Sequence, residues 1–103
     1  PISHIKKFDI RKGDALVELE KYLSDNPHTI ISLAYFDFDI YEPTKKCLSM
    51  IKPYLVKGSL LGFDELCDDN SPGETIALKE IFNLNKIQLH RYRYATSVSY
   101  FIL

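Results

Sequence analysis

The sequence predicts an α/β fold: a mainly parallel sheet that ends in a C-terminal antiparallel hairpin. Strand-like and helix-like segments alternate as far as Leu84, the pattern of parallel strands joined by right-handed crossovers. The run 30–36 is apolar except at Ser32, as expected for a strand covered on both faces. The alternating segments 86–93 and 97–103 are separated by only three residues, which favours a hairpin.

Composition indicates one ordinary globular domain, which we place over residues 1–103. The chain is 46% hydrophobic and 26% charged, and its formal net charge of -1 gives no reason to expect nucleic acid or an anionic membrane as a partner. Its apolar runs are of strand length and resemble neither a membrane span nor a signal peptide, so we expect a cytoplasmic protein. Cys47 and Cys67 lack C-x-x-C spacing and are expected to be reduced thiols.

The first elements are a short strand over 4–11 and an amphipathic helix. Asp14 is a possible N-cap for this helix. The helix should end before Pro27, because a proline disfavours helical geometry in the preceding residue. Its apolar positions recur at helical spacing: Leu16, Leu19 and Leu23.

The apolar strand 30–36 runs into Asp37 and Asp39, and a second helix follows. Pro43 fits the first turn of that helix, where its missing N–H is not needed. Pro53 should kink the helix or convert its last turn, and Gly58 offers the exit. The expected buried stripe is Cys47, Leu48, Ile51 and Leu55.

The next strand, 59–63, also ends in acids, Asp64 and Glu65. A capping box of the S-x-x-E type follows at Ser71-Pro72-Gly73-Glu74, with proline at the first helical position. This helix is expected to run to about Leu84, and the hairpin strands 86–93 and 97–103 complete the chain.

Acidic residues come after each of the first three predicted strands. Ligands of such sheets bind at the carboxyl ends of the strands, so these acids should converge at one edge. Carboxylate oxygens suit Mg²⁺ or Ca²⁺, and no histidine cluster competes for zinc. A bound divalent ion could lower the pKa of a substrate hydroxyl. The acids concerned are Asp14, Asp37, Asp39, Asp64 and Glu65.

These acids also have a purely structural interpretation. Acids after strands are common as helix caps and as solvated loop residues, and Asp39 could simply cap the helix that begins near Pro43. Because two strands of one chain end in acids, the functional and the structural interpretation both stay open.

Four segments together resemble the C-terminal half of class I S-adenosylmethionine-dependent methyltransferases. The most similar type is the magnesium-dependent macrocin O-methyltransferases, which modify sugars. The segments are Gly13-Asp14-Ala15, Phe36-Asp37-Phe38-Asp39-Ile40-Tyr41-Glu42-Pro43-Thr44, Lys57-Gly58-Ser59 leading to Phe63-Asp64-Glu65, and Pro72-Gly73-Glu74.

The resemblance implies a role for each acid. Asp37 corresponds to a metal ligand after the family's fourth strand, and Asp64 with Glu65 to the ligand pair after the fifth. Asp37 and the neighbouring Asp39 are the expected catalytic acids. The loop Gly13-Asp14-Ala15 would face the adenine of S-adenosylmethionine, and the methyl acceptor would be a hydroxyl of a small molecule such as a sugar.

One departure from the family concerns the cofactor site. The chain has four glycines and no G-x-G-x-x-G turn, so it corresponds to a fragment that lacks the first two strands of the family's sheet, whose order is 3-2-1-4-5-7-6. We expect the fragment alone to be inactive. Strand 30–37 should then be an exposed apolar edge, covered by the N-terminal strand moved across, by a second copy of the chain as a homo-oligomer, or by a missing segment.

Two other functions are compatible with the sequence. Haloacid-dehalogenase-type phosphatases also place a D-x-D after an apolar strand, with Asp37 as nucleophile and Asp39 as acid, although they usually have Thr or Val where this chain has Tyr41. The chain could also be a non-enzymatic α/β binding module.

Overall fold

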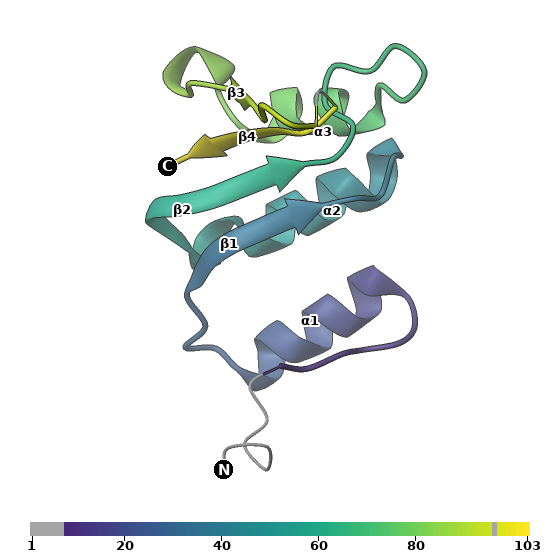
Figure 1. Ribbon diagram of the computed structural model, residues 1–103. Coiled ribbons are helices and arrows are strands. Elements are labelled where there is room, and N and C mark those ends of the chain that lie inside the picture. The colour runs from purple at the N-terminus through teal and green to yellow at the C-terminus, as the bar shows by residue number, and fades with distance from the viewer. Residues whose placement is uncertain (1–7, 96) are drawn as a thin grey trace, which may run out of the picture.

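A four-stranded mixed sheet with strand order β1-β2-β4-β3 forms the middle of the molecule (Figure 1). The computed structural model describes residues 8–95 and 97–103. Along the chain the elements are α1 (Ala15–Asp25), β1 (Ile31–Phe36), α2 (Tyr41–Ile51), the 3₁₀ helix η1 (Lys52–Tyr54), β2 (Leu55–Phe63), α3 (Gly73–Ile81), the 3₁₀ helix η2 (Leu84–Lys86), β3 (His90–Arg91) and β4 (Ser99–Ile102).

The predicted α/β class and the C-terminal antiparallel hairpin are confirmed. β1 and β2 pair in parallel, whereas β4 is antiparallel to both β2 and β3, so the sheet is mixed. The hairpin is much shorter than predicted, because the segment 86–93 contributes only His90–Arg91 to the sheet. The strand order agrees with the 4-5-7-6 part of the sheet that the family resemblance implies.

One face of the sheet carries the hydrophobic core. In Figure 1, α2 and α3 lie behind the sheet, and their apolar sides pack against it. Phe63 stacks on Phe36 at 5.2 Å and on Phe101 at 6.3 Å between ring centroids. Burying one such side chain is worth about 1.5–3 kcal/mol, so this row of rings anchors β1, β2 and β4 together.

The other side of β1 is open. Leu33 is 62% exposed and Tyr35 54% exposed, so the prediction of a strand covered on both faces is wrong for β1. The physical reason is that no helix among the described residues packs over this face. Among residues 8–95 and 97–103, β1 is also an edge strand and pairs with β2 alone, as the resemblance led us to expect.

The predicted strand over 4–11 is not found where the structure can test it. Residues 4–7 lie outside the described residues, and 8–11 form no strand. A strand is stable only with a hydrogen-bonding neighbour, and β1 leaves its outer edge unpaired within 8–95 and 97–103. The described part of this segment has therefore not moved across to cover β1.

The predictions for the ends of the first two helices are mostly confirmed. The Asp14 carboxylate accepts the backbone N–H of Leu16 at 2.9 Å and that of Val17 at 3.4 Å, so it is the N-cap of α1. Pro53 lies in η1, which replaces the last turn of α2. Gly58 is not the exit, because β2 has already begun at Leu55, and Leu55 belongs to that strand rather than to the helix stripe.

The predicted capping box at the start of α3 is wrong. The N-cap is Pro72, and no side chain bonds there. A Cβ on Gly73 would lie 2.7 Å from the carbonyl carbon of Ile40, so the helix start packs directly on the backbone that follows β1. This contact turns Glu74 inward instead of leaving it to cap the helix, which ends at Ile81 rather than near Leu84.

Candidate metal centre

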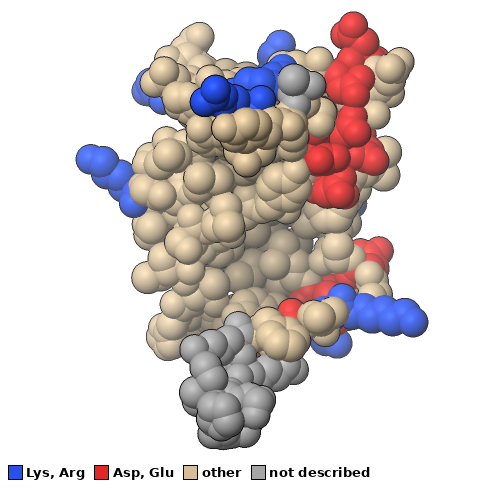
Figure 2. Space-filling model, viewed as in Figure 1, with Lys and Arg blue, Asp and Glu red and all other residues tan. Residues whose placement is uncertain are grey.

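The parallel register of β1 and β2 brings the acids after these strands together. Phe36 pairs with Phe63, and the N–H of Asp64 donates to the carbonyl oxygen of Phe36 at 3.0 Å. Asp37, Asp39 and Asp64 each offer a carboxylate oxygen, and these oxygens lie within 4.8 Å of one another. We call these three residues the acid cluster. Figure 2 shows acidic side chains gathered at the side of the molecule where β1 and β2 end.

Asp39 is not a helix cap, so that alternative is wrong. The N-cap of α2 is Ile40, and no side chain bonds to the first turn there. Asp39 itself has a positive φ of 63°, an uncommon backbone conformation for a residue other than glycine. Such conformations are enriched at functional sites, where the surrounding structure holds them in place. The turn leads the chain into α2 while the Asp39 carboxylate stays in the acid cluster.

Like charges dominate the electrostatics of the acid cluster. The pKa of Asp37 is raised mainly by the nearby Asp64 carboxylate, then by partial desolvation and by Asp39. The Tyr35 hydroxyl donates to Oδ1 of Asp64 at 3.0 Å, and the pKa of Tyr35 is raised by desolvation and by this hydrogen bond. The cluster is thus partly compensated by one donor, and a cation would compensate it further.

Glu65 is outside this group in the described structure. Its carboxyl group hydrogen-bonds to Asp68, which raises the pKa of Glu65 to about 7 and lowers that of Asp68. Asp68 therefore influences the Glu65 carboxyl group more strongly than Asp64 does. A role for Glu65 as a metal ligand stays a prediction.

The loop Gly13-Asp14-Ala15 lies at the start of α1, beside the open side of β1. Gly13 has a φ of 137°, which favours glycine, and the Asp14 carboxylate is engaged as the helix cap. Ala15 lines a hollow between α1 and β1 together with Tyr35, near the end of β1, and Phe38, in the loop that follows it. A contact between this loop and adenine stays a prediction.

Glu74 is the residue of this region that sequence reasoning missed. Its side chain is 0% exposed. Oε2 accepts the N–H of Phe38 and of Asp39, both at 3.2 Å, and Oε1 accepts the N–H of Glu65 at 3.1 Å. Burial raises the pKa of Glu74, and the three N–H donors oppose this rise. The only signal in the sequence was an acid after Pro-Gly, which reads equally well as a capping box.

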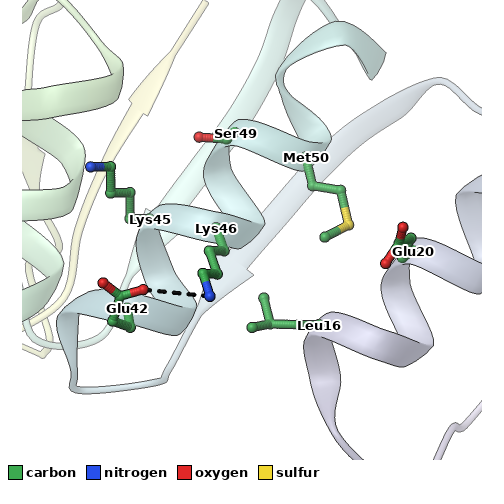
Figure 3. Close-up of a pocket in the computed structure, with 7 residues that line it drawn as sticks. All are labelled: Leu16, Glu20, Glu42, Lys45, Lys46, Ser49 and Met50. Atoms are coloured by element: carbon green, nitrogen blue, oxygen red, sulfur yellow. Dashed lines mark ion pairs between the residues drawn. The ribbon is translucent and has the colours of Figure 1, made fainter.

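A separate hollow between α1 and α2 contains none of the predicted site residues (Figure 3). Glu42 and Lys46, which line it, form an exposed ion pair at 3.6 Å. Lys45 points away from Leu16 and bonds to Glu80 at 2.8 Å and to the Tyr41 hydroxyl at 2.9 Å. The bond from Lys45 to Glu80 joins α2 to α3, so these charged residues of the hollow have structural roles.

Both cysteines are free, as predicted: Cys67 is exposed, and burial raises the pKa of Cys47 to about 11.

None of the helices in the described part of the chain is long and apolar enough to cross a membrane. The cytoplasmic location stays a prediction.

The fold matches part of a sugar O-methyltransferase. The solved apo structure of CalS11, a TDP-rhamnose 3'-O-methyltransferase in calicheamicin biosynthesis, aligns with a TM-score of 0.83 and 42% identity, covering 89% of this chain and 40% of that one. A second structure of CalS11, a calicheamicin methyltransferase, aligns with a TM-score of 0.82 and 43% identity, covering 88% of this chain and 35% of that one. No family model and no curated protein matches the chain.

The chain thus spans about two fifths of the length of the methyltransferase that it resembles. Of the protein classes that the sequence left open, the solved structures reported above belong to a methyltransferase. The match shows a methyltransferase-like fold and carries no information on a metal in this chain.

Proposed function

We propose that this chain forms the metal-binding part of an S-adenosylmethionine-dependent O-methyltransferase that acts on a hydroxyl of a nucleotide-linked sugar. The observation that carries the proposal is the convergence of Asp37, Asp39 and Asp64 at the carboxyl ends of β1 and β2, in a fold that matches a TDP-rhamnose methyltransferase. Binding at this edge is the general rule for open α/β sheets.

The acid cluster fits a divalent cation. Oxygen atoms bound to one Mg²⁺ at about 2.1 Å lie at most about 4.2 Å apart, so oxygens within 4.8 Å of one another need only a small closure. The donors are all carboxylate oxygens. Hard cations such as Mg²⁺ and Ca²⁺ prefer these ligands, whereas softer metals prefer sulfur or nitrogen. Asp37 and Asp64 would hold the ion, with Tyr35 fixing the orientation of Asp64 through its hydroxyl. Glu65 would join them after leaving Asp68.

The residues of the chain then have distinct tasks. A bound Mg²⁺ supplies positive charge that lowers the pKa of a coordinated hydroxyl. Asp39, whose carboxylate lies in the same cluster, would accept the proton of that hydroxyl. Gly13, Asp14 and Ala15 would contact the adenine of the methyl donor, and the remaining cofactor contacts would come from residues outside this chain, which has no glycine-rich turn.

We therefore propose that the chain by itself does not transfer methyl groups, and the test of function uses a chimera. The matched segment of CalS11 is replaced by this chain, and methylation of TDP-rhamnose is measured with S-adenosylmethionine, with and without a chelator. We expect turnover that needs Mg²⁺. Asp37→Asn should lower it by about 100-fold or more, since a lost metal contact is worth several kcal/mol of transition-state stabilisation.

Asp69→Asn is the matched control, because Asp69 is an exposed acid after β2 that is outside the acid cluster. It removes the same charge and should leave turnover unchanged. An active chimera that is insensitive to both the chelator and Asp37→Asn would overturn the proposed role of the metal. Hydrolysis of a phosphate ester by the chain alone would support the phosphatase alternative instead.

A further inference from the structure

Glu74 connects the two loops that carry the acid cluster. One carboxylate oxygen accepts two backbone N–H groups from the loop after β1, at Phe38 and Asp39. The other accepts the N–H of Glu65, from the loop after β2. No other described side chain hydrogen-bonds to the backbone of both loops. One carboxylate thus spans the two acid-bearing loops beyond the last backbone contact of β1 and β2.

Burying a carboxylate at this position costs free energy that a neutral side chain would not cost, which calls for an explanation. Glu74 is fully buried, and it lies near Asp39, whose charge adds to the rise of its pKa. Its compensation comes entirely from the three backbone donors, because it has no cationic partner among the described residues. A neutral side chain or an apolar contact would join the loops without adding negative charge.

The fold delivers Glu74 to this place through Gly73. Only a glycine fits where α3 begins, because a Cβ would clash with the Ile40 backbone. The close approach puts the first turn of α3 beside the turn that contains Asp39. Glu74 accepts the backbone N–H of Asp39 in that turn, with its own carboxylate withdrawn from solvent.

We propose that Glu74 is a positioning residue for the metal centre: its carboxylate holds the loops after β1 and β2 at the spacing that lets Asp37 and Asp64 bind one divalent cation with Asp39 beside it. This inference rests on the proposed function, since it assigns the supporting contact of the same site. Glu74 touches neither metal nor substrate in this assignment. It acts through the backbone N–H groups of Phe38, Asp39 and Glu65.

The test is Mg²⁺ binding by the 103-residue chain, measured by isothermal titration calorimetry at pH 7.5, well below the melting temperature of each variant. Glu74→Gln keeps the size of the side chain but has one acceptor oxygen, so it cannot serve both loops. We expect Mg²⁺ affinity to fall by about 10-fold to 100-fold, the usual effect of losing an outer-shell contact. Glu74→Asp, which keeps the charge but is one methylene too short to span the loops, should show the same loss.

Ser59→Ala is the matched control for a purely structural effect. Ser59 is buried like Glu74, and its hydroxyl accepts the N–H of Val56 and donates to the carbonyl oxygen of Ile31, at the opposite end of the β1–β2 pair. It should lower the melting temperature and leave Mg²⁺ affinity unchanged. Amide hydrogen exchange should accelerate at Phe38, Asp39 and Glu65 in the Glu74 variants only.

The outcomes separate this inference from the function on which it rests. Unchanged affinity in both Glu74 variants would overturn the positioning role and leave the metal site standing. An equal loss in Ser59→Ala would also overturn it, because general destabilisation would then explain the effect. If the unmodified chain binds no Mg²⁺, both the metal site and the role of Glu74 are rejected.

Discussion

The two ends of the β1–β2 pair are each joined by a buried polar side chain, yet they differ in charge. At the amino ends the neutral hydroxyl of Ser59 bridges the two strands through Val56 and Ile31. At the carboxyl ends the bridge is a carboxylate, Glu74, beside three further carboxylates. The first arrangement is what stability alone requires.

The second arrangement accumulates repulsion that the fold does not need. Sites where local rules of stability are broken without local compensation are the expected places for function. The raised pKa of Asp37 and the positive φ of Asp39 belong to the same end of the pair. The comparison therefore favours the carboxyl ends as the place of a functional site, without reference to any relative.

The largest expected effect comes from Gly73→Ala, which damages the carboxyl ends alone. The added methyl group would meet the backbone of Ile40, which cannot move aside as a side chain can. Overpacking of this kind destabilises by about 1–3 kcal/mol. Urea unfolding should show this loss, and Mg²⁺ affinity should fall with it because Glu74 is displaced. Full affinity in the folded variant would show that α3 does not position the acid cluster.

A smaller loss is expected for Tyr35→Phe, which removes one hydrogen bond at the carboxyl ends. The hydroxyl bonds to Asp64, but the side chain is 54% exposed, so we expect a change of less than about 1 kcal/mol in the free energy of unfolding. Gly62→Ala should act on the same bond, because its Cβ would lie 2.8 Å from the Tyr35 ring. Mg²⁺ affinity should decrease slightly in both, and an increase would contradict the role of Tyr35 in orienting Asp64.

Asp37→Asn should reduce the difference in charge between the two ends of the β1–β2 pair. It should also stabilise the metal-free chain. The raised pKa of Asp37 means that the folded chain holds this proton more tightly than the unfolded chain does. The folded state therefore loses stability as the pH rises from about 4 through the raised pKa. Asparagine removes this loss, so the melting temperature at pH 7 should increase slightly. A lower melting temperature without metal would contradict the repulsion that we assign to the cluster.

The smallest effect on stability is expected for Leu33→Lys, which tests the open edge between the two ends. Within the described part of the chain, β1 presents unpaired backbone groups and exposed apolar side chains, and such edges pair with other strands. We propose a second copy of the chain as the partner available in a purified sample. Sedimentation velocity should show concentration-dependent dimers that Leu33→Lys weakens, and a monomer at all concentrations would contradict this.

The parts of the fold that follow from short-range patterns could be predicted from the sequence. Helical spacing located α1 and α2, and the apolar run located β1. The proximity of Asp37 and Asp64 could also be predicted, because each follows a strand and the two strands are parallel neighbours. Parallel register places the residues after such strands side by side.

The errors concern contacts between segments distant in sequence. Burial of Glu74 depends on the approach of Gly73 to Ile40, which no local pattern encodes. The left-handed turn at Asp39 was missed because the sequence there also fits a helix cap. The segment 8–11 has strand-like composition but no neighbouring strand to pair with in the described structure.

The most direct test of the account is a Mg²⁺ titration of the ¹⁵N-labelled chain followed by amide chemical shifts. We predict saturable shifts at residues 37–39 and 64–65, with Ser59 and its neighbours at the amino ends unchanged, and no saturable shifts in Asp37→Asn. The absence of saturable shifts, or equal shifts at both ends of the β1–β2 pair, would contradict a metal centre at the acid cluster.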